Sequence, residues 1–131
     1  MRIVSGIQPT GKYHIGNYLG AVKHWIKLQE EHECFFFIAD LHAITIPQDP
    51  KELRKATLQK IIELVALGLN PERCCLFIQS HIQEAPELAW IFSTIIPMGE
   101  LERMTQYKDK KNKIKEAANA GLFLYPALMA A

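Results

Sequence analysis

The segment Ser5–Asn17 holds the residues whose types and spacing are best suited to chemistry. It reads Ser-Gly-Ile-Gln-Pro-Thr-Gly-Lys-Tyr-His-Ile-Gly-Asn and joins a strand predicted over residues 2–6 to an amphipathic helix predicted over residues 15–31. Its glycines, proline, imidazole and carboxamide let backbone N–H groups and a helix N-terminus approach a phosphate. The linker is longer than the tight turn of a G-x-G-x-x-G dinucleotide site. The sequence therefore predicts a loop that wraps a polyphosphate.

Two polar side chains in this loop, His14 and Asn17, flank Gly16 at the predicted helix start. His14 can donate a hydrogen bond to a phosphate, and Asn17 offers an amide on the next helical turn. Gly16 leaves room for a flat base to lie against the backbone. The alternative is an asparagine cap beside a chance histidine, and these residues alone leave the two interpretations evenly balanced.

The elements that must position this loop follow from hydrophobic periodicity. After the first helix, apolar runs predict strands over residues 34–39 and 74–78, and Asp49-Pro50-Lys51-Glu52 predicts the capped start of a helix that ends near Gly68. Further helices are predicted over 86–95 and 98–108, and another from about 113 that is interrupted around 121–126. The predicted buried stripes are Ile15, Leu19, Val22 and Ile26 on the first helix, and Leu53, Thr57, Ile61, Leu64 and Val65 on the second.

This β-α-β-α-β order predicts an α/β fold with a parallel sheet and right-handed crossovers. The run 34–39 is apolar without alternation, which predicts a strand covered on both faces. Ligands of such sheets bind at the carboxyl ends of the strands. The three exits carry polar groups at Ser5–Thr10, at Asp40 and His42, and at Gln79–His81, so one cleft could collect all three.

Composition limits the class of protein without identifying a ligand. The 131 residues are 49% apolar and carry a formal net charge of +1, which suits one ordinary globular domain and does not mark a nucleic-acid binder. Five lysines do cluster between residues 108 and 115, and their charge pattern alone favours a solvated helix face. The three cysteines have neither disulfide nor zinc spacing, so we expect free thiols in a reducing compartment and no metal site.

The two ends of the chain add three expectations. The N-terminus predicts a strand rather than a signal peptide, and no apolar run approaches the ~20 residues that a membrane helix needs. The last residues, 125–131, are apolar and helix-forming, and three strands make a thin sheet. We therefore expect no membrane span, and an α/β domain that is incomplete at its C-terminus.

Pro9-Thr10-Gly11 followed by His14-Ile15-Gly16-Asn17 resembles the first signature of class I aminoacyl-tRNA synthetases. The resemblance extends along the whole chain, in order, to the tryptophanyl-tRNA synthetase family. It includes Gly99–Gln106, which argues against the related tyrosyl enzymes. The matching stretches are Ser5–Pro9, Asp40–Thr45, Gly99–Gln106 and Ala120–Ala131.

This resemblance implies a Rossmann-like sheet with helices on both faces, and places residues 1–131 in the N-terminal part of a catalytic domain. It implies a ligase that uses ATP with Mg²⁺ to activate L-tryptophan and then esterifies tRNA(Trp). It also implies a cytoplasmic homodimer. The apolar run expected at the two-fold interface comprises Ile91, Ile95, Ile96, Pro97 and Met98, although periodicity alone favours ordinary core for these residues.

The resemblance also implies roles for individual residues. His14 and Asn17 face the phosphates as catalytic groups, together with Lys110 at the pyrophosphate end. The ATP loop is formed by Gln8, Pro9 and Thr10, with Gly16 against adenine and Asn17 near the phosphates. The expected amino-acid pocket comprises Val4, Gly6, Gln8, His42, Tyr125 and Met129.

Some features leave alternatives open. Many bacterial members of the family have phenylalanine where this chain has Val4, so one aromatic wall of the pocket is replaced. His42 alone favours a satisfied strand-end histidine, and Tyr125 with Met129 alone favours core packing. The indole-binding aspartate expected after Ala131, the Lys-Met-Ser-Lys-Ser signature and the anticodon-binding domain are absent from this sequence. The alternative function is therefore a truncated nucleotide-binding Rossmann module without ligase activity.

Overall fold

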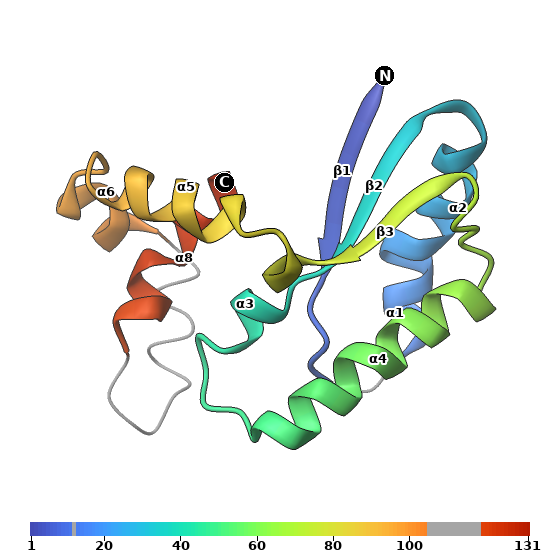
Figure 1. Cartoon of the computed structure of the whole chain (residues 1–131), viewed down its shortest axis with the longest axis horizontal. Helices are drawn as coiled ribbons and strands as arrows, with labels where there is room; N and C mark the ends of the chain where they lie inside the picture. The colour runs from blue at the N-terminus through green and yellow to red at the C-terminus, as the bar shows by residue number, and fades with distance from the viewer. Residues whose placement is uncertain (12, 105–118) are drawn as a thin grey trace. The chain divides into compact units, whose positions relative to one another are not determined.

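The computed structural model describes residues 1–11, 13–104 and 119–131, which fall into two compact units (Figure 1). The sheet unit comprises Met1–Ala43 and Gln48–His81, and the helical unit comprises Ile44–Pro47 and Ile82–Ala131. Four predictions fall outside the described residues: the end of the helix predicted over 98–108, the solvated face of the lysine cluster between 108 and 115, the helix start near residue 113, and the position of Lys110.

The sheet unit is built on three parallel strands in the order β1-β2-β3, which Figure 1 shows side by side. They are β1 (Arg2–Ile7), β2 (Glu33–Ile38) and β3 (Cys74–Ile78). Ile7, Ile38 and Ile78 are in register, so the three strands end at one edge of the sheet. The predicted parallel α/β class is confirmed.

Helical segments connect these strands. Between β1 and β2 lie α1 (Ile15–Asn17), the π-helical turn η1 (Tyr18–Val22) and α2 (Lys23–Glu31), and between β2 and β3 lie α3 (Asp40–Ala43) and α4 (Pro50–Ala66). The 3-10 turn η2 (Gln79–His81) follows β3. Asp49 caps α4 as predicted, because its carboxylate accepts hydrogen bonds from the backbone N–H groups of Lys51 and Glu52, both at 2.9 Å. Gly68 ends this helix with a φ of +118°, a conformation that favours glycine.

The core of the sheet unit lies on one face of the sheet, where α2 and α4 both pack. Burial alternates along β2, with Cys34, Phe36 and Ile38 buried and the phenylalanines between them half-buried, so one face of the strand is covered more completely than the other, whereas the sequence predicts cover on both. Monotonic strand order with right-handed crossovers places successive helices on the same face. The core residues are Val22, Trp25, Cys34, Phe36, Ile38, Leu64, Leu69 and Cys74.

The opposite face of the sheet is apolar and partly open among the described residues. Val4 is 63% exposed, Cys75 is exposed, and Phe35, which is in register with both, is half-buried. The Phe37 and Phe77 rings stack on this face with centroids 5.5 Å apart. The Rossmann-like class thus holds, whereas the described helices of this unit cover a single face.

Two predicted helix stripes differ from the observed ones. Ile15 and Leu19 are 70% and 51% exposed, because the π-helical turn places more residues in one turn and rotates the preceding side chains away from the core. On α4, Val65 is also exposed and Lys60 is buried instead. The other predicted members of the α4 stripe are buried or half-buried.

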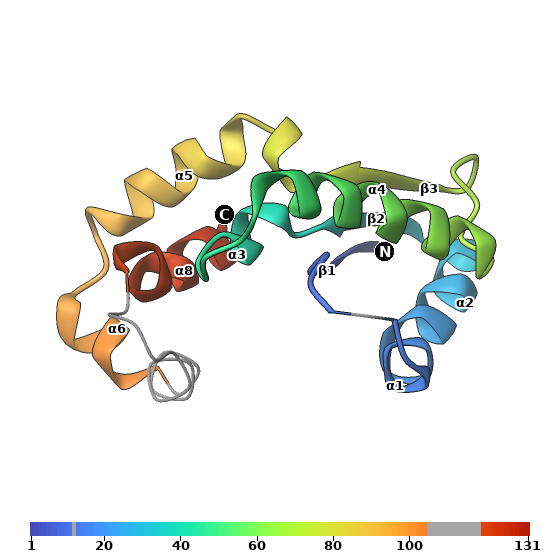
Figure 2. The ribbon, with the colours of Figure 1, turned by 90° about the horizontal axis from the view of Figure 1, so that it is seen from below.

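The helical unit contains α5 (Glu84–Ser93), α6 (Met98–Arg103) and α8 (Ala120–Ala130), with α5 beside α8 (Figure 2). The predicted interruption around 121–126 is wrong, since α8 continues through Pro126. Proline removes one helical hydrogen bond, and packing that buries Leu122, Tyr125 and Ala127 sustains the helix. Asn119 caps α8 by accepting a hydrogen bond from Leu122 N–H at 2.8 Å. None of the helices within the described ranges is both long and apolar enough to cross a membrane.

Candidate functional site

The carboxyl edge of the sheet gathers the polar exits of all three strands. The backbone N–H of Ala39, just after β2, donates to the carbonyl of Ile7 at the end of β1 at 2.9 Å. Asp40 lies two residues beyond the end of β2, and Ser80 lies two residues beyond the end of β3. The three exits therefore lie at the single edge where parallel α/β sheets bind their ligands.

The loop that leaves β1 presents the predicted nucleotide-binding residues. Pro9 is buried, Gln8 is half-buried and Thr10 is exposed, with the Thr10 hydroxyl 3.5 Å from Gln8 Oε1. Gly11 has a φ of +79°, where a side chain would be strained. The loop thus begins at the buried Pro9 and continues into an exposed turn at Gly11.

His14 lies at the start of α1, where the backbone holds it. Its N–H donates to Asn17 Oδ1 at 3.1 Å, and its carbonyl accepts from Asn17 N–H at 2.9 Å. A Cβ added to Gly16 would be 2.9 Å from His14 Nδ1, closer than packing allows. The imidazole therefore lies against Gly16, which brings three predicted site residues together in an exposed helix start.

Tyr13, which sequence reasoning did not assign, anchors this loop to α4. The Lys60 ammonium lies 4.6 Å from the centre of the Tyr13 ring, within the range of a cation–π contact. Lys60 also forms a 3.0 Å ion pair with Glu63, which compensates the burial of its charge. Burial, together with the nearby Glu63 carboxylate, raises the pKa of the Tyr13 hydroxyl. A buried lysine in an otherwise apolar helix stripe is the sequence signal that could have indicated this anchor.

A second cluster ties the exits of β2 and β3 together. Asp40 Oδ1 accepts from Leu41 N–H and from Ser80 N–H, both at 3.0 Å, and Asp40 Oδ2 accepts from the Ser80 hydroxyl at 2.5 Å. His42 Nδ1 lies 3.2 Å from Gln79 Oε1. We call Asp40, His42, Gln79 and Ser80 the exit cluster. The sequence predicts both exits at this edge but not the hydrogen bonds that join them.

Gly6 and Val4 precede the exits on β1. A Cβ at Gly6 would lie 2.5–2.8 Å from the Phe37 ring, so packing alone excludes a side chain there. Val4 lies on the same face and is largely exposed. The small residues on β1 therefore leave an open apolar surface next to the Phe37 ring.

Tyr125 and Met129 belong to the helical unit, one turn apart on α8. Tyr125 is 3% exposed and burial raises the pKa of its hydroxyl, whereas Met129 is 59% exposed. Core packing thus suits Tyr125 but not Met129.

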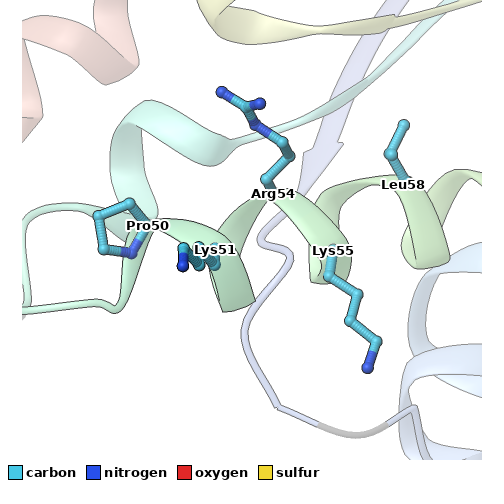
Figure 3. Close-up of a pocket in the computed structure, with 5 residues that line it drawn as sticks. All are labelled: Pro50, Lys51, Arg54, Lys55 and Leu58. Atoms are coloured by element: carbon cyan, nitrogen blue, oxygen red, sulfur yellow. The ribbon is translucent and has the colours of Figure 1, made fainter.

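A shallow groove of about 460 Å³ runs along the N-terminal half of α4 (Figure 3). Its lining includes Lys51, Arg54 and Lys55, of which Arg54 and Lys55 point to different sides of the helix in Figure 3. Asp49 and Glu52 in the same turns offset much of this positive charge. None of the lining residues is a predicted site residue. Within the described ranges, no three His, Cys, Asp or Glu side chains are grouped to hold a metal ion.

Comparison with known proteins identifies the group to which this arrangement belongs. The family described as tRNA synthetases class I (W and Y) matches residues 1–131. The chain belongs to this family. It is 54% identical over 132 residues to tryptophan–tRNA ligase 2 of Streptomyces avermitilis and 51% identical over 129 residues to tryptophan–tRNA ligase of Rickettsia conorii. The alignments cover 99% and 98% of this chain, respectively.

Solved structures of the same family agree with this assignment. Tryptophanyl-tRNA synthetase of Campylobacter jejuni, complexed with ADP and tryptophan, superimposes with a TM-score of 0.93 at 45% identity over 99% of this chain and 40% of that one. A tyrosyl-tRNA synthetase of Archaeoglobus fulgidus superimposes with a TM-score of 0.80 at 22% identity over 98% of this chain and 41% of that one, which shows the shared fold alone. The chain spans 39% of the length of each of the two tryptophan–tRNA ligases named above.

Proposed function

We propose that this chain is the N-terminal part of the catalytic domain of a tryptophan–tRNA ligase. The full-length protein would activate L-tryptophan with ATP, accompanied by Mg²⁺ as part of the substrate complex, and transfer the tryptophanyl group to tRNA(Trp) in the cytoplasm. Support comes from similarity along the whole chain to tryptophan–tRNA ligases at 51–55% identity, and to a synthetase that binds ADP and tryptophan.

In the first step of the proposed reaction, a tryptophan carboxylate oxygen attacks the α-phosphorus of ATP. The bond from that phosphorus to the bridging oxygen breaks, and pyrophosphate leaves with the electron pair. A ribose hydroxyl at the tRNA 3′ end then attacks the adenylate carbonyl, gives up its proton to solvent as the ester bond forms, and AMP leaves. The protein's task is to align two anions and to stabilise charge on the leaving phosphates.

The observation that carries the proposal is the His14–Gly16–Asn17 helix start at the carboxyl edge of β1. Here an exposed imidazole lies against a glycine in the first turn of α1, after an exposed turn at Gly11. A helix N-terminus and a hydrogen-bond donor are what a phosphate group requires. We propose that His14 and Asn17 contact the phosphates, with Lys110 at the pyrophosphate end. Gln8, Pro9 and Thr10 would form the ATP loop.

The proposed amino-acid pocket comprises Val4, Gly6, Gln8, His42, Tyr125 and Met129. Four of these residues share the open face or the carboxyl edge of the sheet, and a largely exposed Met129 leaves its thioether available to an aromatic ring. Valine at position 4 gives a smaller wall than an aromatic residue, so we expect looser packing of the indole on that side.

ATP–pyrophosphate exchange by the full-length protein, with each amino acid supplied in turn, tests this function. We expect exchange with tryptophan alone. Exchange with tyrosine and not with tryptophan would contradict the substrate assignment. ATP binding without exchange by any amino acid would favour the alternative, a nucleotide-binding module without ligase activity.

The isolated 131-residue chain should exchange far more slowly than the full-length protein. Compared with the family pattern, it lacks the indole-binding aspartate and the lysine-rich signature. The loss of one buried hydrogen-bond partner costs about 1–3 kcal/mol. A rate equal to that of the full-length protein would refute this expectation.

We also propose a homodimer. Ile91, Ile95 and Met98, members of the predicted interface run, are exposed in the helical unit together with Trp90. An isologous contact requires a self-complementary apolar patch of this kind. Sedimentation of the full-length protein at micromolar concentration should give a dimer, and a clean monomer would rule the dimer out.

A further inference from the structure

Asp40 makes more hydrogen bonds than a strand-end carboxylate needs to satisfy its own turn. One bond, to Leu41 N–H, is local, whereas the two bonds to Ser80 N–H and the Ser80 hydroxyl cross from the exit of β2 to the exit of β3. A carboxylate that accepts several hydrogen bonds forms charge-assisted contacts, which are stronger than neutral ones. Asp40 therefore links two neighbouring strand exits through its hydrogen bonds with Ser80, and we call this link the clip.

This clip acts directly next to the partner of His42. Ser80 follows Gln79 in the chain, so fixing the Ser80 backbone also fixes the peptide that carries the buried Gln79 side chain. On the other side, α3 begins at Asp40 and contains His42. Both sides of the hydrogen bond between His42 Nδ1 and Gln79 Oε1 are thus held by the same carboxylate.

The chemistry of that hydrogen bond sets the state of the imidazole. A carboxamide oxygen can only accept, so Nδ1 must carry the proton when it bonds Gln79 Oε1. Which nitrogen of a neutral histidine is protonated depends on the partner that the ring is given. A shift of the Gln79 side chain would remove the acceptor that holds the proton on Nδ1.

We infer that Asp40 is a positioning residue for the amino-acid pocket: its clip to Ser80 holds Gln79 in place and thereby fixes the orientation and the Nδ1-protonated form of His42. This inference rests on the proposed role of His42 in binding tryptophan. Loss of the Asp40 carboxylate should weaken tryptophan binding and leave the phosphate chemistry at His14 intact.

The matched control is Asp49, a second capping aspartate in the same unit. Its carboxylate also accepts two backbone N–H groups, those of Lys51 and Glu52, but both belong to α4 itself. Asp40→Asn and Asp49→Asn therefore remove the same charge from the same kind of turn. Only the first weakens a link between two strand exits, because the asparagine NH₂ group that replaces Oδ2 cannot accept the hydrogen bond from the Ser80 hydroxyl.

Kinetics of the full-length protein provide the first test. In tryptophan-dependent exchange, we expect Asp40→Asn to raise KM for tryptophan about tenfold, in the range of lost buried polar contacts, with kcat and KM for ATP nearly unchanged. Ser80→Ala should raise KM for tryptophan by a smaller factor, because it keeps the Asp40 carboxylate and its charge-assisted bond from the Ser80 N–H. Asp49→Asn should lower the melting temperature without changing KM. Equal KM values in the Asp40 and Asp49 variants would overturn the inference, and Ser80→Ala decides the matter if Asp40→Asn does not fold.

The nitrogen spectrum of His42 provides the second test and does not depend on activity. In protein labelled with ¹⁵N-histidine, with the His42 signals identified by their absence in His42→Gln, we expect Nδ1 to be protonated in the wild type. Asp40→Asn should give a mixture of ring forms, and Asp49→Asn should not. An unchanged His42 spectrum in Asp40→Asn would refute the positioning role. Absence of tryptophan-dependent exchange in the wild type would instead refute the proposed function, and the spectrum would still test the clip.

Discussion

His14 and His42 both lie at the carboxyl edge of the sheet, but the chain holds them in different ways. His14 is exposed, and the hydrogen bonds that fix it to Asn17 run through its main-chain N–H and carbonyl. His42 is half-buried, and its ring bonds Gln79 within a cluster that links two strands. In the first case the backbone is ordered and the side chain faces solvent. In the second case the side chain itself is part of the structure.

This difference indicates how each residue should respond to substitution. An exposed side chain on an ordered backbone can be removed with little loss of stability, so any functional effect reports on contact with a ligand. Removal of a side chain that is part of a hydrogen-bonded cluster affects stability and geometry together. Substitutions at His14 should therefore change activity without changing stability, whereas substitutions in the exit cluster should change both.

The largest expected effect is on catalysis at His14. His14→Ala in the full-length protein should lower kcat for tryptophan-dependent exchange about 100-fold, the usual cost of one donor to developing charge. The melting temperature and KM for tryptophan should not change. His24→Ala, which removes an exposed histidine from α2, is the control and should leave all three values unchanged. A loss of tryptophan affinity with kcat maintained would place His14 in the amino-acid pocket instead.

The second prediction tests whether tight packing extends from the exit cluster to β1. Gly6→Ala should lower the free energy of unfolding by about 1–3 kcal/mol, because the added methyl group would overlap the Phe37 ring. Gly20→Ala is the matched control, since no heavy atom lies within 4 Å of the Cβ it would add. Denaturant titration measures both variants. Equal stabilities would show that the Phe37 ring moves aside without cost.

A third, smaller effect concerns the contact between Gly16 and His14. Gly16→Ala should displace the imidazole and slow exchange about tenfold, less than the loss of the whole side chain. Stability should hold or rise, because alanine is a better helix former than glycine by ~1 kcal/mol. Unchanged exchange would indicate that the imidazole has a second productive position.

The smallest effect is expected at Tyr13. Its hydroxyl is buried and has no hydrogen-bond partner among the described residues, so Tyr13→Phe should raise the free energy of unfolding by about 1 kcal/mol. Tyr13→Leu should lower it, because the contact between the ring and the Lys60 ammonium is lost. Thermal unfolding of the two variants should shift in opposite directions. A decrease with phenylalanine would show that the hydroxyl has a partner.

Local signals made much of the fold predictable. Asp49 and Pro50 predict the start of α4 through capping chemistry, and three apolar runs predict the strands. The face of the helix after β1 was predicted wrongly, because a π-helical turn between Tyr18 and Val22 leaves no periodic signal of its own. The continuation of α8 through Pro126 was also missed, since packing against α5 outweighs the local effect of proline.

The candidate site was predictable as a set of positions but not as a set of contacts. Motif spacing places His14, Gly16 and Asn17 at a helix start, where the structure brings them together. The bond from Asp40 to Ser80 joins residues 40 positions apart in the sequence. Such a pair depends on strand order and register, which residue types alone do not specify. The functional roles assigned to the predicted site residues all remain predictions.

The alternation of side chains along β3 has a practical consequence for chemical labelling. Cys74 points into the core and Cys75 to the open face of the sheet, while Cys34 is buried beside Cys74. Burial raises the pKa of the Cys34 and Cys74 thiols, which keeps them protonated and unreactive. Among the three thiols of this chain, a maleimide fluorophore should therefore modify Cys75 first. Its emission would report directly on whatever covers that face of the sheet in the full-length protein.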